Sequence, residues 1–127
     1  MVHIRRHYEQ ALDENRQPAE HALSEIQHLY KVEHMCDDAG LSPEERKAKR
    51  QELSKPIMEA MKLWMETEGV KYSESSQIGK AITYAYTRWD NMMRYLEARC
   101  RIIQKHLMRN YYNCYRISGN SHIQNLS

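Results

Sequence analysis

Residues 78–96 read IGKAITYAYTRWDNMMRYL, and this stretch decides the fold. Its apolar side chains recur every three or four residues, which is the spacing that places them on one side of an α-helix. They are Ile78, Ala81, Ile82, Ala85, Trp89, Met92, Met93 and Leu96. Since the pattern lasts for about five turns, it predicts an amphipathic helix with one buried side. We expect this side to pack on a preceding helix that carries Ile57, Met61 and Trp64.

The chain before this stretch also has the pattern of helices. Apolar residues at helical spacing predict one helix over residues 3–13 and a second from near Pro18 to Gly40. A third helix is expected between Ser42 and Gly69, and a polar connector follows it. The sequence therefore predicts a small all-α domain of four to five helices.

The third helix has a strong start signal, Ser42-Pro43-Glu44-Glu45. The Ser42 side chain can accept a hydrogen bond from the backbone N–H of Glu45, whose carboxylate reaches back to the backbone of Ser42. Pro43 occupies the first helical position, where the backbone N–H has no partner in any case. Farther along, Pro56 is expected to kink or divide the helix, because a proline inside a helix removes a hydrogen bond.

The composition agrees with a helical protein. The 127 residues include four glycines and three prolines, which are too few turn residues for a many-stranded β fold. Eight methionines and no phenylalanine suit helix faces better than strands. The length fits one domain, and no apolar run approaches the roughly 20 residues that a membrane span requires.

The cysteines and the first residues bear on the compartment. Cys36, Cys100 and Cys114 are odd in number and include no C-x-x-C pair, so they indicate neither a disulfide framework nor a zinc site. The start of the chain lacks the apolar segment of a secretory signal. These features predict a protein of the reducing cytoplasm.

Charge divides the chain near residue 97. Residues 1–97 carry 14 basic and all 17 acidic residues, a net charge of −3, whereas residues 98–127 carry five basic residues and no acid. Two interpretations are open: a basic tail that binds nucleic acid, or an end that is foreign to the rest of the chain. We expect a helical domain over 1–97 and a divergent segment over 98–127. Residues 110–127 lack an amphipathic stripe and are expected to be poorly ordered.

Basic residues are the candidates for DNA binding, because phosphate contacts give weak, sequence-tolerant affinity. The candidate set is Arg5, Arg6, Arg99, Arg101, Lys105 and Arg109. The run RKAKR at residues 46–50 is more basic, but glutamates flank it at helical spacing. We therefore expect an exposed, salt-bridged helix at that run and no DNA-reading surface.

The sequence signals for metal binding and catalysis are weak. His3 and His7 stand one helical turn apart, a spacing that lets two imidazoles share a metal. No third ligand stands near them in the sequence, so surface positions are the expected alternative. No nucleophile with its base, phosphate loop or pair of spaced carboxylates is recognisable. The residues by themselves predict no catalytic residue, no metal site and no small-molecule substrate.

Several short motifs, taken in order, resemble the insertion sequence 66 family of transposases. They are His3-Ile4-Arg5-Arg6, Ala11-Leu12-Asp13-Glu14-Asn15, Ile26…Leu29-Tyr30…Glu33, Gly40-Leu41-Ser42-Pro43-Glu44-Glu45-Arg46, Ser54-Lys55-Pro56-Ile57, Gly79-Lys80-Ala81-Ile82…Tyr84-Ala85 and Trp89…Tyr95-Leu96. Each motif alone is weak. Their common order and spacing over residues 2–97 make the resemblance specific.

The resemblance implies a ribonuclease-H-like catalytic core in the intact protein. There, two aspartates and a glutamate hold two magnesium ions for strand cleavage and joining. This chain would begin after the second aspartate, with His3 at the histidine of the family's Cys-Trp-Ala-His stretch and Met1 inside the ancestral reading frame. Residues 13–88 would correspond to the helical insertion that precedes the catalytic glutamate.

That glutamate should follow Glu97 closely, but residues 98–103 read ARCRII and contain no acid. The resemblance therefore implies a truncated transposase fragment that lacks catalysis and magnesium of its own and whose end, from about residue 98, is frameshifted or recombined. Its implied partners are transposon-end DNA or another subunit, including a second copy of itself. The alternative is a standalone helical module for protein interaction or non-specific DNA binding, in which the basic tail is functional.

Overall fold

The helices predicted from the apolar spacing are present in the computed structural model, which describes residues 1–97. They are α1 (Val2–Gln10), α2 (Arg16–Asp38), α3 (Pro43–Lys49), α4 (Lys55–Glu68) and α5 (Gln77–Met93). A π-helical stretch, η1 (Arg50–Ser54), joins α3 to α4, and short 3-10 helices, η2 (Gly69–Lys71) and η3 (Arg94–Glu97), follow α4 and α5. No strand occurs in this part of the chain, so the all-α prediction is confirmed.

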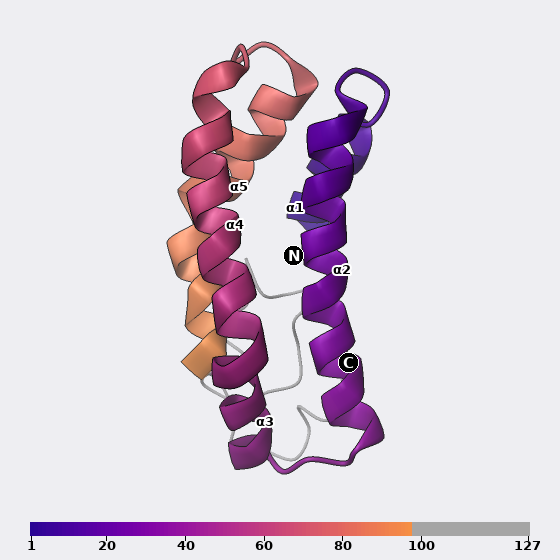
Figure 1. Ribbon diagram of the computed structural model, residues 1–127, viewed down its shortest axis with the longest axis vertical. Coiled ribbons are helices and arrows are strands. Elements are labelled where there is room, and N and C mark those ends of the chain that lie inside the picture. Colours follow the sequence, from indigo (N-terminus) through magenta and orange to yellow (C-terminus); the bar gives the residue numbers. More distant parts are fainter. Residues whose placement is uncertain (98–127) are drawn as a thin grey trace.

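The helices lie side by side along the long axis of the molecule. In Figure 1, α2 runs along one side, and α3 and α4 form a continuous column beside it. α5 packs against α4, and α1 packs against both α5 and α2. Their apolar sides meet in a single core. Within residues 1–97, no helix has the length and apolar character that crossing a membrane requires.

Of two sequence predictions about helix boundaries, one needs correction. The first helix ends at Gln10 and not near residue 13, because the chain turns over residues 11–14. Pro56 divides the third helix as predicted, since the segment is split into α3, η1 and α4. It lies in the first turn of α4, directly after η1, where the hydrogen-bonding pattern of the helix changes. The column then continues to Glu68.

The predicted start of α3 is confirmed atom by atom. Ser42 Oγ accepts from the backbone N of Glu45 at 3.2 Å, and Glu45 Oε1 accepts from the backbone N of Ser42 at 3.1 Å. The preceding turn uses Gly40, whose φ of +62° is the left-handed conformation that favours glycine. The backbone N of Leu41 then donates to the carbonyl of Cys36 at 3.1 Å, which closes the end of α2.

The core contains the side of α5 that the sequence predicted. The predicted positions Ile78, Ile82, Ala85, Trp89 and Met92 are all buried. Of the expected partners on α4, Met61 is buried, whereas Ile57 and Trp64 are partly buried at the edge of the core. Met58 and Met65 complete the buried side of α4.

Gly79 lies where α5 begins, in close contact with the connector before it. Ser76 Oγ accepts from the backbone N of Gly79 at 3.0 Å and caps the helix. A Cβ on Gly79 would lie 2.0 Å from the carbonyl oxygen of Ser73, a distance that forces the backbone to move. The position therefore requires glycine for space.

We expect Gly79→Ala to lower the free energy of unfolding by about 1–3 kcal/mol, as overpacking does in other cores. Chemical denaturation followed by circular dichroism measures the change. Gly69→Ala is the matched control. A Cβ there would meet only the end of the Ile82 side chain, at 3.3 Å. Equal stability of the two variants would show that the Ser73 contact is not restrictive.

Candidate nucleic-acid interface

The two arginines near the N-terminus that were predicted to contact DNA have different environments. Arg5 Nε lies 3.1 Å from Glu9 Oε1, and its guanidinium carbon lies 5.9 Å from the centre of the Tyr30 ring. Arg6 is exposed and has no acidic partner within residues 1–97. Arg6 and His7 follow His3 by three and four residues, so both are neighbours of His3 on the surface of α1. Arg6 is thus the better placed of the two arginines to meet an anion.

A second row of residues lies along α5, formed by Lys80, Tyr84 and Arg88 at intervals of four. The docking of α1 on α5 stacks the His7 ring on the Tyr84 ring, with the centroids 4.0 Å apart. The guanidinium carbon of Arg88 lies 3.8 Å from the centroid of the same tyrosine ring. Two helices that are distant in the sequence therefore bring their cationic residues to one surface.

The cations of this surface lack acidic partners among the residues that the structure describes. Lys80 and Arg88, like Arg6, form no ion pair there. Eight other cations each pair with an acid: Arg5, Arg16, Arg46, Lys47, Lys49, Arg50, Lys62 and Lys71. Lys31, Lys55 and Arg94 also form no ion pair within residues 1–97, but they lie on other elements, α2, α4 and η3. We call His3, Arg6, His7, Lys80 and Arg88 the basic face. Sequence reasoning missed its α5 half, although the interval of four between Lys80, Tyr84 and Arg88 was visible.

A groove of about 480 Å³ opens on the basic face. Its lining includes His7, Lys80, Tyr84 and Arg88, together with Glu74 from the connector before α5. Partial burial, then the charges of Arg88 and His3, lower the pKa of His7 below its ordinary value of 6.5. Positive charges thus crowd the histidine, and a bound anion would relieve the repulsion.

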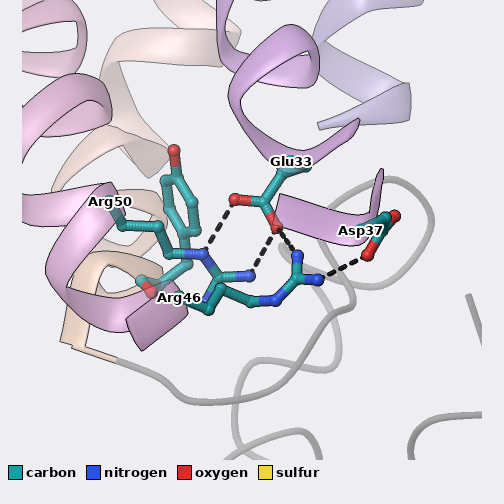
Figure 2. A network of polar contacts seen from close by, with 5 residues as sticks. Glu33, Asp37, Arg46 and Arg50 are labelled. Carbon is teal, nitrogen blue, oxygen red and sulfur yellow. Dashed lines mark hydrogen bonds and ion pairs between the residues drawn. The ribbon is translucent and has the colours of Figure 1, made fainter. Parts of the chain in front are cut away.

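A second polar cluster is buried between α2 and the α3–α4 column. Figure 2 shows Glu33 between Arg46 and Arg50. Glu33 Oε1 accepts from Arg46 Nη1 at 2.9 Å and from Arg50 Nη2 at 2.7 Å, and Oε2 accepts from Arg50 Nε at 2.8 Å. Arg46 also pairs with Asp37. We call Glu33, Asp37, Arg46 and Arg50 the ionic cluster.

The ionic cluster overturns one prediction. The RKAKR run was expected to form an exposed helix face, but Arg46 and Arg50 are only 3% and 0% exposed. Arg46 and Arg50 are four residues apart, so both side chains point toward α2. There Glu33 supplies the negative charge that a buried guanidinium requires. The expectation holds for Lys49, which pairs with Glu52 at 3.3 Å in an exposed position. Buried arginines of this kind are unavailable to DNA.

Side chains of α3 and η1 also hold residues 95–97 against the bundle. Arg50 Nη1 donates to the carbonyl of Tyr95 at 3.3 Å, and Gln51 Nε2 donates to the carbonyl of Leu96 at 2.9 Å. Glu97 accepts from Gln51 at 2.9 Å and pairs with Lys47 at 3.3 Å. Residues 95–97 are therefore held in place by side chains of α3 and η1.

The other candidate residues named from the sequence lie in several places. Within residues 1–97, no three His, Cys, Asp or Glu side chains are grouped as a metal site requires. His3 is exposed on α1, and the ring partner of His7 is a tyrosine. Four DNA-contact candidates lie outside the described residues: Arg99, Arg101, Lys105 and Arg109. The expected disorder of residues 110–127 also lies outside them.

Comparisons with known proteins agree with the sequence resemblance. Residues 1–104 match the family described as "Transposase IS66 family". The chain is 36% identical over 76 residues to the "Uncharacterized protein y4hP" of Sinorhizobium fredii (strain NBRC 101917 / NGR234). That alignment covers 60% of this chain and 13% of the other protein, so the chain spans a small part of its relative's length. A search of the solved structures finds no match.

Proposed function

Because the chain belongs to the IS66 family of transposases, we propose that its helical bundle serves DNA transposition by contacting DNA. The basic face is the observation that carries this proposal. Arg6, Lys80 and Arg88 have no acidic partner within residues 1–97, although acids outnumber bases in that range. Cations that form no ion pair within the protein can bind the phosphates of a DNA backbone. Each such contact releases counterions from the DNA, and this release favours binding.

We propose that strand cleavage and joining belong to other parts of the family's protein. Two-metal phosphoryl chemistry needs converging carboxylates that hold the ions about 4 Å apart. Within residues 1–97 no three possible metal ligands are grouped in this way, and some of the acids are used in ion pairs and caps, as Glu33 and Glu45 illustrate. Magnesium would then be held by the family's Asp-Asp-Glu core and not by this bundle. The bundle would supply a shaped, cationic surface next to that core.

DNA binding by the chain should be weak, tolerant of sequence and strongly dependent on salt. The three unpaired cations of the basic face predict a slope of about −3 for log affinity against log salt, at roughly 0.9 per phosphate contact. Contacts by Arg99, Arg101, Lys105 or Arg109 would make the slope steeper. Fluorescence anisotropy with a labelled 20-base-pair duplex measures the slope between 50 and 300 mM salt.

Three results would contradict the proposal. Absence of binding at 50 mM salt with micromolar protein would exclude a DNA-contacting role for the chain. A complex that is insensitive to salt and specific for one sequence would exclude phosphate contacts as its basis. Binding that disappears when residues 98–127 are removed would assign the activity to the tail, as the standalone-module alternative predicts.

A further inference from the structure

The groove on the basic face has donors that the fold itself leaves unused. Arg88 donates only from Nη1, to the carbonyl of Tyr84 at 3.2 Å and to Thr87 Oγ1 at 3.1 Å, among the residues described. Its Nε and Nη2 hydrogens therefore remain for a ligand, because a guanidinium has five donors. Lys80 is exposed one turn before Tyr84 and has three further donors.

We propose that this groove holds a stretch of DNA strand, with Arg88 and Lys80 contacting different phosphates and His7 lying beside them. The inference rests on the proposed function and names the site through which it acts. Arg88 is held in place before binding, because it lies on the Tyr84 ring and is bonded to the backbone of its own helix. A pre-positioned guanidinium loses less conformational freedom on binding than a free one.

The length of the site favours an extended polyanion over a single phosphate. Lys80 and Arg88 are eight residues apart on one side of α5, which is a distance of about 12 Å along the helix axis. Cations spread along a row give an extended anion more contacts than a single phosphate offers. A DNA strand carries a charge every ~3.4 Å along the duplex axis and can contact both cations. Threonine and tyrosine hydroxyls also donate to phosphates, and Thr83 and Tyr84 line the groove together with the two cations.

The charges around His7 give the site a dependence on pH. Arg88, Lys80 and Tyr84 of α5, His3 of α1 and the carboxylate of Glu74 are the charged or titratable groups on the surfaces around it. Since the pKa of His7 is lowered below 6.5, its imidazole is mostly neutral at pH 7.5 in the unbound chain. A phosphate nearby favours the protonated form. Binding should therefore strengthen as pH falls from 7.5 toward 5.5, and His7→Gln should reduce that gain.

The test compares variants that each remove one positive charge from the full chain. Arg88→Gln and Lys80→Gln remove cations from the groove. Lys55→Gln removes an exposed cation of α4 that lines no part of it and has no acidic partner among the described residues. Affinity for the labelled duplex is measured at several salt concentrations, after melting curves show which variants are folded. Lys80→Gln keeps the test valid if Arg88→Gln unfolds, because no contact of the Lys80 side chain within the bundle is lost.

We expect each groove variant to lose roughly five- to tenfold in affinity near 0.1 M salt and to flatten the salt slope by about 1. Lys55→Gln should change both quantities much less. If the wild-type chain binds DNA and the groove variants behave like Lys55→Gln, the groove is not the site although the proposed function stands. If the wild-type chain does not bind DNA, both the proposed function and this inference fail.

Two competitors identify the kind of anion. Inorganic phosphate that displaces the duplex more strongly than chloride of equal ionic strength would indicate a site for a single phosphate and overturn the inference. Vesicles of anionic phospholipid that bind the wild-type chain more tightly than the duplex does, with the same loss in Arg88→Gln, would assign the groove to a membrane surface and overturn it as well. Displacement by unlabelled DNA alone supports it.

Discussion

Replacing Glu33 with Gln is expected to lower the free energy of unfolding by about 3–5 kcal/mol, because it leaves buried guanidinium charge without its counter-charge. Glu33 is 4% exposed and accepts three hydrogen bonds from Arg46 and Arg50. The substitution keeps the shape of the side chain but removes its charge. Urea unfolding followed by circular dichroism gives the difference. A loss of this size is a large part of the stability of a small domain.

The control for this prediction is Glu52→Gln. Glu52 also pairs with a cation, Lys49, but both side chains are exposed, so water compensates for the lost charge. We expect little change in that variant. A second comparison uses the triple variant Glu33→Met, Arg46→Met and Arg50→Met. Apolar residues can often replace a buried ionic cluster without loss of stability, so we expect this variant to be more stable than Glu33→Gln. If Glu33→Gln is as stable as Glu52→Gln, the ionic cluster does not hold the bundle together.

Replacing Trp89 with Ala should cost about 3–5 kcal/mol, since it removes a large buried side chain and leaves a cavity. Trp89 is 0% exposed, and its Nε1 donates to the carbonyl of Met58 at 2.9 Å. The side chain thus joins α5 to α4 by packing and by a hydrogen bond. Thermal unfolding followed by circular dichroism measures the effect. Such a loss can unfold a marginal domain at 37 °C.

Tyr86→Ala is the matched control on the same helix, because Tyr86 is 41% exposed and lies outside the core. It should change stability much less than Trp89→Ala. Trp89→Phe separates packing from hydrogen bonding, since it keeps an aromatic ring but loses the donor to Met58. An unchanged melting temperature in Trp89→Ala would show that α5 is not packed as described.

The parts of the fold that follow local rules could be predicted from the sequence. The buried side of α5 follows from the spacing of Ile78, Ile82, Ala85 and Trp89 along one helix. The start of α3 follows from Ser42 and residues within three positions of it. In both cases the groups that interact are neighbours in the sequence, so no knowledge of packing was needed.

The ionic cluster and the basic face could not be predicted because their partners are distant in the sequence. From helical spacing, Arg46 and Arg50 were predicted to pair with the glutamates that flank them. Their main partner is instead Glu33, which lies 13 and 17 residues earlier on another helix. The groove likewise requires the docking of His7 on Tyr84, which joins the first helix to the last. Burial of a charge is decided by tertiary packing, which periodicity does not report.

The π-helical stretch η1 determines which way the side chains of α4 face relative to those of α3. The buried residues Arg46, Arg50, Ser54 and Met58 are spaced by four. In a plain α-helix each such step overshoots a full turn by about 40°, so three steps would rotate Met58 by roughly 120° away from Arg46. A π-helix has more residues per turn and takes up part of that rotation. Deleting one residue from 51–54 would leave Arg46 and Met58 eleven residues apart, which in a plain α-helix brings them within about 20° of each other, so the π-helical stretch acts as a one-residue insertion that keeps both buried sides facing the core.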